Sequence, residues 1–270
     1  TQEYKDQDMS ERSSKLKTRL RQGETTYGAW LTVPHTMIAE VMAGAGFDWV
    51  LIDTEHGGFS NEGLQSCLVA FNGSPTVPMV RVAWNDAVLI KQVLDMGADG
   101  ILVPMVSSPA EARAAVSACK YPPEGTRGFG PRRASDYGRN IDAYVAQANE
   151  SVIVIVQIEH VNGVATIDGI LDTPGIDVAC LGPTDLSGSA GVLRQFQHPV
   201  VVDGMTKVIQ AARARQMPAS IGITFAEDDM QKWYGVGANF IFCGDDTTML
   251  SSYVGTTLAS MRRRMSGKAD

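Results

Sequence analysis

Short apolar runs alternate with longer amphipathic stretches along this chain. The clearest run covers residues 152–158, reads VIVIVQI and ends at Glu159. Apolar residues that follow one another without polar alternation are typical of a strand covered on both faces, as in a parallel sheet. A helix-like segment separates this run from a second one at residues 178–181, which leads through Gly182 to Asp185. The pattern predicts two parallel strands, each with a carboxylate near its C-terminal end.

The same alternation extends over most of the chain. It predicts strands at residues 27–31, 48–52, 77–81, 100–103, 152–158, 178–181, 219–223 and 239–243. It predicts helices at residues 15–21, 36–43, 61–71, 86–96, 108–120, 141–149, 198–215 and 227–234. Eight strand-helix units in sequence predict an α/β fold, a (β/α)8 or TIM barrel, as a single domain over residues 15–270. Residues 1–14 are polar and lack periodicity, so we expect a flexible N-terminal tail there.

Composition fits such a barrel and argues against several classes of protein. The chain has 270 residues, 44% of them hydrophobic, and a formal net charge of -7. A nucleic-acid binder normally carries a clustered basic face, whereas the basic run at residues 262–264 suits the end of a C-terminal helix. No apolar stretch reaches the length of about 18 residues that a membrane span needs. The four cysteines are widely spaced and predict reduced core thiols, so we expect a cytoplasmic protein without membrane or nucleic-acid partners.

A Pro/Gly-rich loop at residues 121–133 interrupts the alternation. It carries Arg127, Arg132 and Arg133. Long loops in compact domains are often functional, because a simple connection needs only a few residues. The loop lacks the glycine spacing of a phosphate-binding motif. We predict that it faces substrate or a neighbouring subunit, with a plain surface loop as the alternative.

Glu159 and Asp185 are candidate metal ligands. About one strand-helix-strand unit separates them, so their strand ends lie side by side at the mouth of the predicted barrel. Paired carboxylates bind hard divalent ions and leave other positions to water and substrate, as magnesium sites do. The plainer interpretation is that both are helix N-cap or first-turn acids. We favour metal binding, because both follow strands and come with a mouth-facing arginine and histidine.

Polar residues at other strand ends complete the predicted mouth. His56 is a candidate general base, and Asp53 three residues earlier is placed to orient it. Glu55 is an alternative acid for that supporting role. Arg81 ends the third strand, and its planar guanidinium suits a carboxylate clamp. A structural ion pair of Arg81 with Asp86 or Asp95 is the alternative.

Further residues of the predicted mouth, together with the absence of several catalytic motifs, reduce the number of reaction types that the sequence allows. Gln157 ends the fifth strand, and Gly182 and Thr184 offer backbone N–H groups to a bound anion. The sequence has no HxxxH pair, no Cys/His cluster and no GxSxG turn. The lysines fall on predicted helix surfaces rather than at strand ends. A Schiff-base aldolase is therefore disfavoured, and metal-assisted enolisation is favoured.

Several short motifs lie one after another along the chain. They are AGAGFDW at residues 43–49 leading to IDTEH at 52–56, VR at 80–81 with WND at 84–86, LVPMV at 102–106, YPPEG at 121–125 with RG at 127–128, VQIE at 156–159 and LGPTDLS at 181–187. As a set they resemble the HpcH/HpaI aldolase family, and the resemblance covers nearly everything from about Gly28 to Leu258. Each motif alone is of modest specificity, but the joint set is specific.

The resemblance implies a metal-dependent (class II) pyruvate aldolase of the phosphoenolpyruvate/pyruvate barrel superfamily. Such enzymes reversibly cleave a 4-hydroxy-2-oxo acid to pyruvate and an aldehyde through a metal-stabilised pyruvate enolate. By this analogy Glu159 and Asp185 bind magnesium, manganese or cobalt. The family also implies a homohexamer in which the last helix is exchanged between neighbouring subunits.

The resemblance also implies a role for each remaining candidate at the mouth. Arg81 would stabilise the enolate oxygen, and Gln157 would support the pyruvate. Backbone groups of Gly182, Pro183 and Thr184 would hold the pyruvate carboxylate. His56, positioned by Asp53 or Asp95, would move the proton of the aldol hydroxyl.

Departures from the family pattern at residues 129–133 and 187–194 leave the aldehyde acceptor open. The arginines at residues 127, 132 and 133 favour an acidic or sugar-derived acceptor. An oxaloacetate decarboxylase or a macrophomate-synthase-like enzyme, using the same enolate, is the alternative. A catalytically silent assembly subunit would predict the loss of the metal acids, Arg81 or His56, and all of these residues are present.

Overall fold

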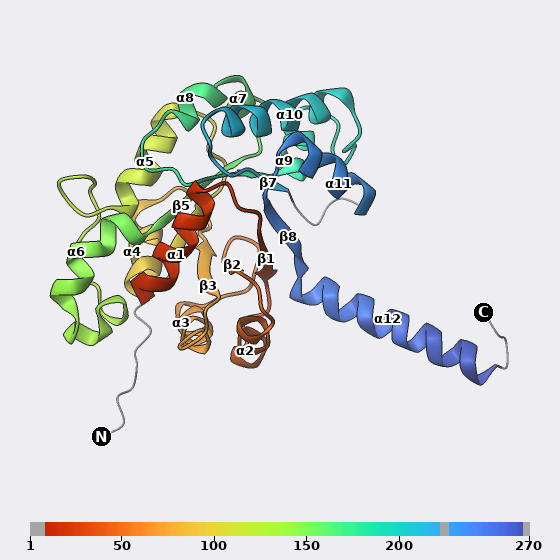
Figure 1. Ribbon diagram of the computed structural model, residues 1–270, viewed down its shortest axis with the longest axis horizontal. Coiled ribbons are helices and arrows are strands. Elements are labelled where there is room, and N and C mark those ends of the chain that lie inside the picture. The colour runs from red at the N-terminus through yellow and green to blue at the C-terminus, as the bar shows by residue number, and fades with distance from the viewer. Residues whose placement is uncertain (1–8, 222–226, 267–270) are drawn as a thin grey trace.

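Eight parallel strands form a barrel in the computed structural model, which describes residues 9–221 and 227–266 (Figure 1). The hydrogen-bonded strand order is β6-β5-β4-β3-β2-β1-β8-β7. A parallel bridge between Ala179 and Ala219 joins β6 to the residue before β7 and closes the sheet. The strands are β1 (Thr26–Leu31), β2 (Trp49–Asp53), β3 (Val77–Arg81), β4 (Gly100–Val103), β5 (Ile153–Ile158), β6 (Val178–Leu181), β7 (Ser220–Ile221) and β8 (Phe240–Asp245).

Helices surround the sheet in the order that the alternating pattern predicts, which confirms the (β/α)8 barrel. They are α1 (Met9–Arg21), α2 (Thr36–Gly44), α3 (Asn61–Ala70), α4 (Ala87–Asp95), α5 (Pro109–Cys119), η1 (Arg133–Gly138), α6 (Ile141–Ser151), α7 (Val161–Ala165), α8 (Ile167–Leu171), α9 (Pro183–Ser189), α10 (Pro199–Ala214), α11 (Glu227–Val236) and α12 (Asp246–Met265). The helix-like segment between β5 and β6 is split into α7 and α8. The predicted strand positions 222 and 223 lie outside the described residues.

Two apolar clusters hold the barrel together. One lies between the sheet and the surrounding helices and includes Phe71, Ile101 and Trp233. The other includes Trp49 of β2 and Phe240 of β8, whose rings stack with centroids 3.9 Å apart. Strands buried on both faces explain why the runs that predicted them are continuously apolar.

Helix α1 begins earlier than the sequence predicts. The sequence predicts a flexible tail over residues 1–14, but residues 9–14 form the first turns of the helix, and residues 1–8 lie outside the described range. Arg12 explains the difference, because its Nε lies 2.7 Å from an Asp99 carboxylate oxygen and its Nη1 donates to the Phe71 carbonyl. Leu16 and Leu20 are buried in the second apolar cluster. Contacts across the fold, rather than local pattern, extend this helix.

Two arginines of the loop at residues 121–133 do not reach the mouth. Arg127 is buried and donates to Asp95, the last residue of α4, over 2.7 Å. Arg133 is buried and donates to the carbonyls of Met96 and Leu68. These helix ends lie beside the N-terminal ends of the strands, opposite the mouth. The use of these two arginines as evidence for an acidic acceptor is therefore wrong for a site within this chain.

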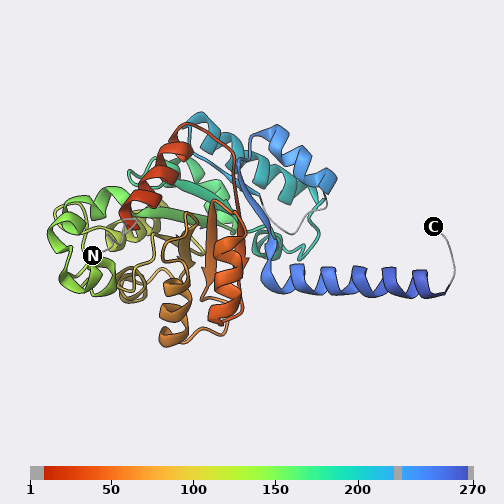
Figure 2. The same cartoon turned by 60° about the horizontal axis from the view of Figure 1, so that its bottom comes forward.

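Helix α12 projects from the barrel as a long arm (Figures 1 and 2). Its exposed apolar side chains include Leu250, Val254, Leu258, Met261 and Met265. Their spacing of three and four residues places them on one side of the helix. In the part of the chain that the structure describes, no helix is both long enough and apolar enough to cross a membrane.

Candidate active site

A buried ion pair at the C-terminal ends of β2 and β3 is the first element of the mouth. Asp53 and Arg81 are the last residues of these strands and face each other in the register. The Arg81 Nε and Nη2 atoms donate to the two Asp53 carboxylate oxygens over 2.9 and 2.7 Å. The Arg81 Nη1 atom also lies 3.2 Å from a Glu55 oxygen. The alternative of a pair with Asp86 or Asp95 is wrong, since Asp86 caps α4 and Asp95 binds Arg127.

Charge and an aromatic ring fix the Arg81 guanidinium further. Its central carbon lies 4.4 Å from the ring centroid of Trp30, which itself stacks on Phe242. Burial alone would raise the pKa of Asp53, but the hydrogen bonds from Arg81 outweigh it and lower that pKa. Asp53 is therefore an anion that keeps Arg81 positively charged and oriented.

His56 stands at the open side of this pair. Its side chain is 68% exposed, and its Nε2 atom lies 3.9 Å from a Glu55 oxygen. Asp53 accepts the backbone N–H groups of Glu55 and His56, so it orders the turn rather than the imidazole. Asp95 lies at the opposite end of the barrel on Arg127, and its predicted contact with His56 is wrong within one chain. Glu55 is the carboxylate nearest to His56 among the contacts of the described residues.

Glu159 is a buried carboxylate on the other side of the mouth. It directly follows β5, is 3% exposed and accepts the Met105 N–H over 2.7 Å. Burial raises the pKa of Glu159 to about 7, and the negative charges of Asp185 and Glu55 add to the effect while the Met105 N–H opposes it. Met105 has a φ of 56°, a conformation that non-glycine residues seldom adopt. The backbone is thus strained at the point where it holds Glu159.

Gln157 and Gly182 pack beside Glu159. The Gln157 side chain is buried, and its Oε1 atom has no hydrogen-bond partner among the described residues. A Cβ on Gly182 would lie 2.3 Å from the Glu159 Oε2 and 2.9 Å from the Gln157 Nε2. Buried polar atoms without partners are costly, so the Gln157 carbonyl is suited to a donor or cation brought by a ligand.

The backbone N–H groups that follow β6 are not all available to bind an anion, as the sequence predicts them to be. The Gly182 N–H donates to the Ile158 carbonyl, and Pro183 has no N–H. Thr184 is therefore the member of this trio that retains an N–H for a bound anion. Asp185 lies in the first turn of α9, is exposed, and interacts electrostatically with Glu159 and Glu55.

These residues fit a hard divalent cation. Across residues 9–221 and 227–266, no three His, Cys, Asp or Glu side chains form a metal cluster by themselves. Two carboxylates with coupled charges are nevertheless an all-oxygen donor set that leaves places for water and substrate, the arrangement that magnesium favours. Burial raises the pKa of Glu159, and the buried Gln157 Oε1 lies beside it without a hydrogen-bond partner among the described residues.

Replacing Gly182 by alanine is expected to lower kcat/KM for lyase activity at least about 100-fold, because the new methyl group would displace Glu159 and Gln157. Steady-state kinetics with thermal melting of both proteins tests this. Gly44→Ala in α2, where a Cβ meets nothing within 4 Å, is the matched control and should leave kcat/KM unchanged. Equal activity of Gly182→Ala and wild type would contradict this geometry.

Two residues that the sequence did not single out take part in the site. Trp30 holds the face of Arg81, and Met105 holds Glu159 through its backbone. Trp30 lies one residue before the end of β1, so a search just before the strand ends as well as after them finds it. Nothing in the sequence signals the φ of Met105.

Three of the cysteines lie in the core as predicted. Cys67, Cys119 and Cys180 are buried free thiols. Cys243 is exposed, so the prediction of a core thiol is wrong at that position.

Comparison with known proteins places this site in context. Residues 26–252 match the HpcH/HpaI aldolase/citrate lyase family. A 4-hydroxy-2-oxo-heptane-1,7-dioate aldolase of Salmonella dublin is 42% identical over 240 residues, which cover 87% of this chain and 90% of that protein.

Solved structures agree with this match. An HpcH/HpaI aldolase/citrate lyase family protein from Burkholderia cenocepacia superposes with a TM-score of 0.88 at 33% identity, covering 92% of this chain and 99% of that one. Macrophomate synthase superposes with a TM-score of 0.82 at 30% identity, covering 97% of this chain and 92% of that one.

Proposed function

Because the chain belongs to the HpcH/HpaI aldolase/citrate lyase family and is a carbon-carbon lyase of the aldolase type, we propose that its mouth cleaves 4-hydroxy-2-oxo acids to pyruvate and an aldehyde, and runs the reverse addition. One observation carries the proposal. Arg81, held by Asp53, Glu55 and Trp30, and the buried Glu159, which has no ion-pair partner among the described residues, lie at the same end of the barrel. That pairing suits a substrate that carries a carboxylate and develops negative charge on a neighbouring oxygen.

Glu159 and Asp185 would hold a divalent cation in this proposal, with magnesium, manganese and cobalt as the candidates. Bound there, the cation would draw electrons from the 2-oxo group and lower the energy of enolate formation. Gln157 would turn its free carbonyl oxygen toward the same place. The strained backbone at Met105 keeps one Glu159 oxygen occupied and so leaves the other for the ligand.

Arg81 would stabilise the oxygen that becomes negative as the bond breaks. A guanidinium has five N–H donors, and Asp53 and Glu55 do not engage all of them. The ion pair and the Trp30 ring hold the group in place before the substrate arrives, so little reorganisation is needed during the reaction.

His56 would take the proton from the 4-hydroxyl group. As this proton leaves, the electron pair of the O–H bond forms the aldehyde carbonyl, the bond between C3 and C4 breaks, and the electron pair of that bond passes to the pyruvate enolate. Protonation at C3 then yields pyruvate. Glu55 lies within reach of both His56 and Arg81 and would hold the imidazole toward the substrate.

Pyruvate release from a panel of 4-hydroxy-2-oxo acids and from oxaloacetate, each assayed with magnesium, manganese or cobalt, tests the proposal. Release from a hydroxy-oxo acid together with its aldehyde supports it and identifies the acceptor. Release from oxaloacetate alone would replace it with the second candidate, a decarboxylase or macrophomate-synthase-like enzyme. The structural likeness to macrophomate synthase keeps that candidate in consideration.

The arm formed by α12 favours a homo-oligomer, and the hexamer with an exchanged last helix stays our prediction for its form. An exposed apolar side of this length needs a partner surface in water. Met37 and Val41 of α2 are also exposed apolar residues, one helical turn apart, and offer a surface for the arm of another copy. A cytoplasmic location likewise stays a prediction.

The double variant Val254→Glu, Leu258→Glu is expected to reduce the assembly to smaller species, because it places two charges on the apolar side of α12. Light scattering coupled to size-exclusion chromatography measures the change in mass. Ser252→Glu, on the opposite side of the same helix, is the matched control and should retain the wild-type mass. A double variant of unchanged mass would rule out this side of α12 as the interface.

A further inference from the structure

The end of the barrel opposite the mouth, where the strands begin, has a fourfold repeat. A glycine, one variable residue and then Asp or Asn precede each even-numbered strand. The four corners are Gly46 with Asp48 before β2, Gly97 with Asp99 before β4, Gly175 with Asp177 before β6 and Gly237 with Asn239 before β8. All four glycines have positive φ, between 88° and 126°, which side chains resist. The four corners are thus the same structural unit, with one neutral member.

Each corner residue bonds to the preceding strand in the same way. The backbone N–H groups of Asp48, Asp99, Asp177 and Asn239 donate to the carbonyls of Tyr27, Pro78, Val154 and Ala219, respectively. In three corners the side chain also accepts an N–H from that same partner residue. Pro78 has no N–H to give, so Asp99 lacks this contact. Equivalent positions therefore place all four side chains at equivalent points around the barrel end.

Helix α1 supplies a cation to each of the three acidic corners. Arg12 lies 2.7 Å from Asp99, and Lys17 lies 3.2 Å from Asp177. Arg19 pairs with Asp48. At the fourth corner, among the described residues, the Asn239 Nδ2 instead donates to the Gly23 carbonyl oxygen over 3.2 Å. Three corners are charge-paired and one is not.

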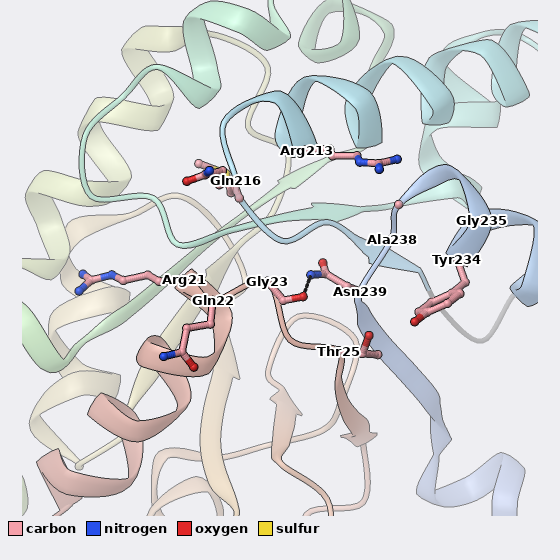
Figure 3. Close-up of a pocket in the computed structure, with 12 residues that line it drawn as sticks. Arg21, Gln22, Gly23, Thr25, Arg213, Gln216, Tyr234, Gly235, Ala238 and Asn239 are labelled. Atoms are coloured by element: carbon pink, nitrogen blue, oxygen red, sulfur yellow. Dashed lines mark hydrogen bonds between the residues drawn. The ribbon is translucent and has the colours of Figure 1, made fainter.

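A pocket of about 490 Å³ opens at the fourth corner (Figure 3). Arg21 at the end of α1 and Arg213 of α10 flank it from opposite sides, and Asn239 lies between them. Neither arginine has an acidic partner within ion-pair distance among the described residues, although Arg19 and Arg215 close by in sequence each have two. No Asp or Glu of the described residues lines the pocket. The corner that lacks its own carboxylate thus has an open pocket and two arginines without an ion-pair partner in the described part of the chain, of which Arg21 also acts electrostatically on Asp177.

We propose that this fourth corner is a binding site for a small anion with carboxylate or phosphate oxygens. Arg213 packs over Gly237, where a Cβ would lie 3.0 Å from its side chain, and its guanidinium fork suits either oxyanion. Tyr234 and Gln216 add donors to the lining. The bound anion takes the electrostatic place that Asp48, Asp99 and Asp177 fill at the other corners. The site is separate from the mouth, which lies at the other end of the strands.

Isothermal titration of the full chain with inorganic phosphate, and separately with succinate, tests the proposal. Saturable binding of one anion or of both supports it, and the difference between them identifies the preferred oxygen source. Arg213→Gln and Asn239→Asp are each expected to weaken binding at least tenfold, the first by removing a donor and the second by placing a carboxylate in the corner. Thermal melting of both variants shows that the fold is retained.

Two control variants distinguish binding at this corner from a general effect of charge and from binding at the mouth. Arg113→Gln removes an exposed arginine of α5 and should bind as wild type, whereas an equal loss in that variant would show a mere effect of net charge. Arg81→Lys removes the guanidinium fork of the mouth and should also bind as wild type. Binding that survives Arg213→Gln unchanged, or the absence of saturable heat up to about 10 mM of either anion, would overturn the proposal.

Discussion

Glu159→Gln is expected to lower kcat/KM for pyruvate release about 1,000-fold, which corresponds to about 4 kcal/mol of transition-state stabilisation. The substitution keeps the shape of the side chain and an oxygen for the Met105 N–H. It removes the negative charge that the buried site offers to a divalent cation. Because one ligand charge is lost, manganese binding measured by calorimetry should weaken together with activity.

Glu111→Gln is the matched control for this substitution. Glu111 accepts the Ser107 N–H near the same end of the barrel, but it is exposed and belongs to the first turn of α5. The activity and manganese binding of the Glu111→Gln variant should equal those of wild type. Normal turnover by the Glu159→Gln variant would contradict a role of Glu159 in the reaction.

Arg81→Lys is expected to lower kcat about 100-fold to 1,000-fold, with a smaller change in KM. Lysine retains the positive charge, so the buried Asp53 and the partly buried Glu55 are not left without a counter-charge. It has no planar fork, so it cannot bind both Asp53 oxygens in parallel and direct a further N–H to the substrate. A loss in kcat separates a transition-state role from simple substrate binding.

Arg113→Lys on the surface of α5 is the control for the arginine-to-lysine change and should be silent. Thermal melting of Arg81→Lys checks that the buried pair still supports the fold. An increase in KM alone, with kcat unchanged, would contradict the proposed role of Arg81 at the developing negative oxygen.

Much of this architecture could be predicted because parallel strands covered on both faces have a simple sequence signature. The run at residues 152–158 is continuously apolar since both faces of β5 are buried. The position of Glu159 after that run follows from the same logic, as does Arg81 at the end of β3. Strand ends gather at one mouth in this fold, so polar residues there could be assigned to a common site before any contact was known.

Contacts between distant segments could not be predicted in the same way. The first turns of α1 depend on the hydrogen bond from Arg12 to Asp99, and no local sequence pattern predicts that contact. The anchoring of Arg81 by Glu55 and Trp30 likewise depends on side-chain packing across strands.

Chain order alone predicts that Asp95, Arg127 and Arg133 lie away from the mouth. A segment that follows a helix and precedes a strand lies at the N-terminal end of the barrel, away from the mouth. Asp95 ends α4, and the loop at residues 121–133 follows α5, so both meet this rule. The sequence also contains the spacing of a glycine two residues before Asp or Asn that precedes each even-numbered strand. This spacing predicts the four corners at the N-terminal end of the barrel.

A divalent cation held by Glu159 and Asp185 at the mouth is central to the proposed reaction. The measurement that tests this is pyruvate release from a 4-hydroxy-2-oxo acid by wild-type protein before EDTA, after EDTA and gel filtration, and after manganese is restored, with Asp185→Asn beside it. We predict that EDTA abolishes release, that manganese restores it in wild type, and that Asp185→Asn regains little at the same manganese concentration. Turnover that is untouched by EDTA in protein shown by elemental analysis to be free of metal would contradict the proposed metal mechanism.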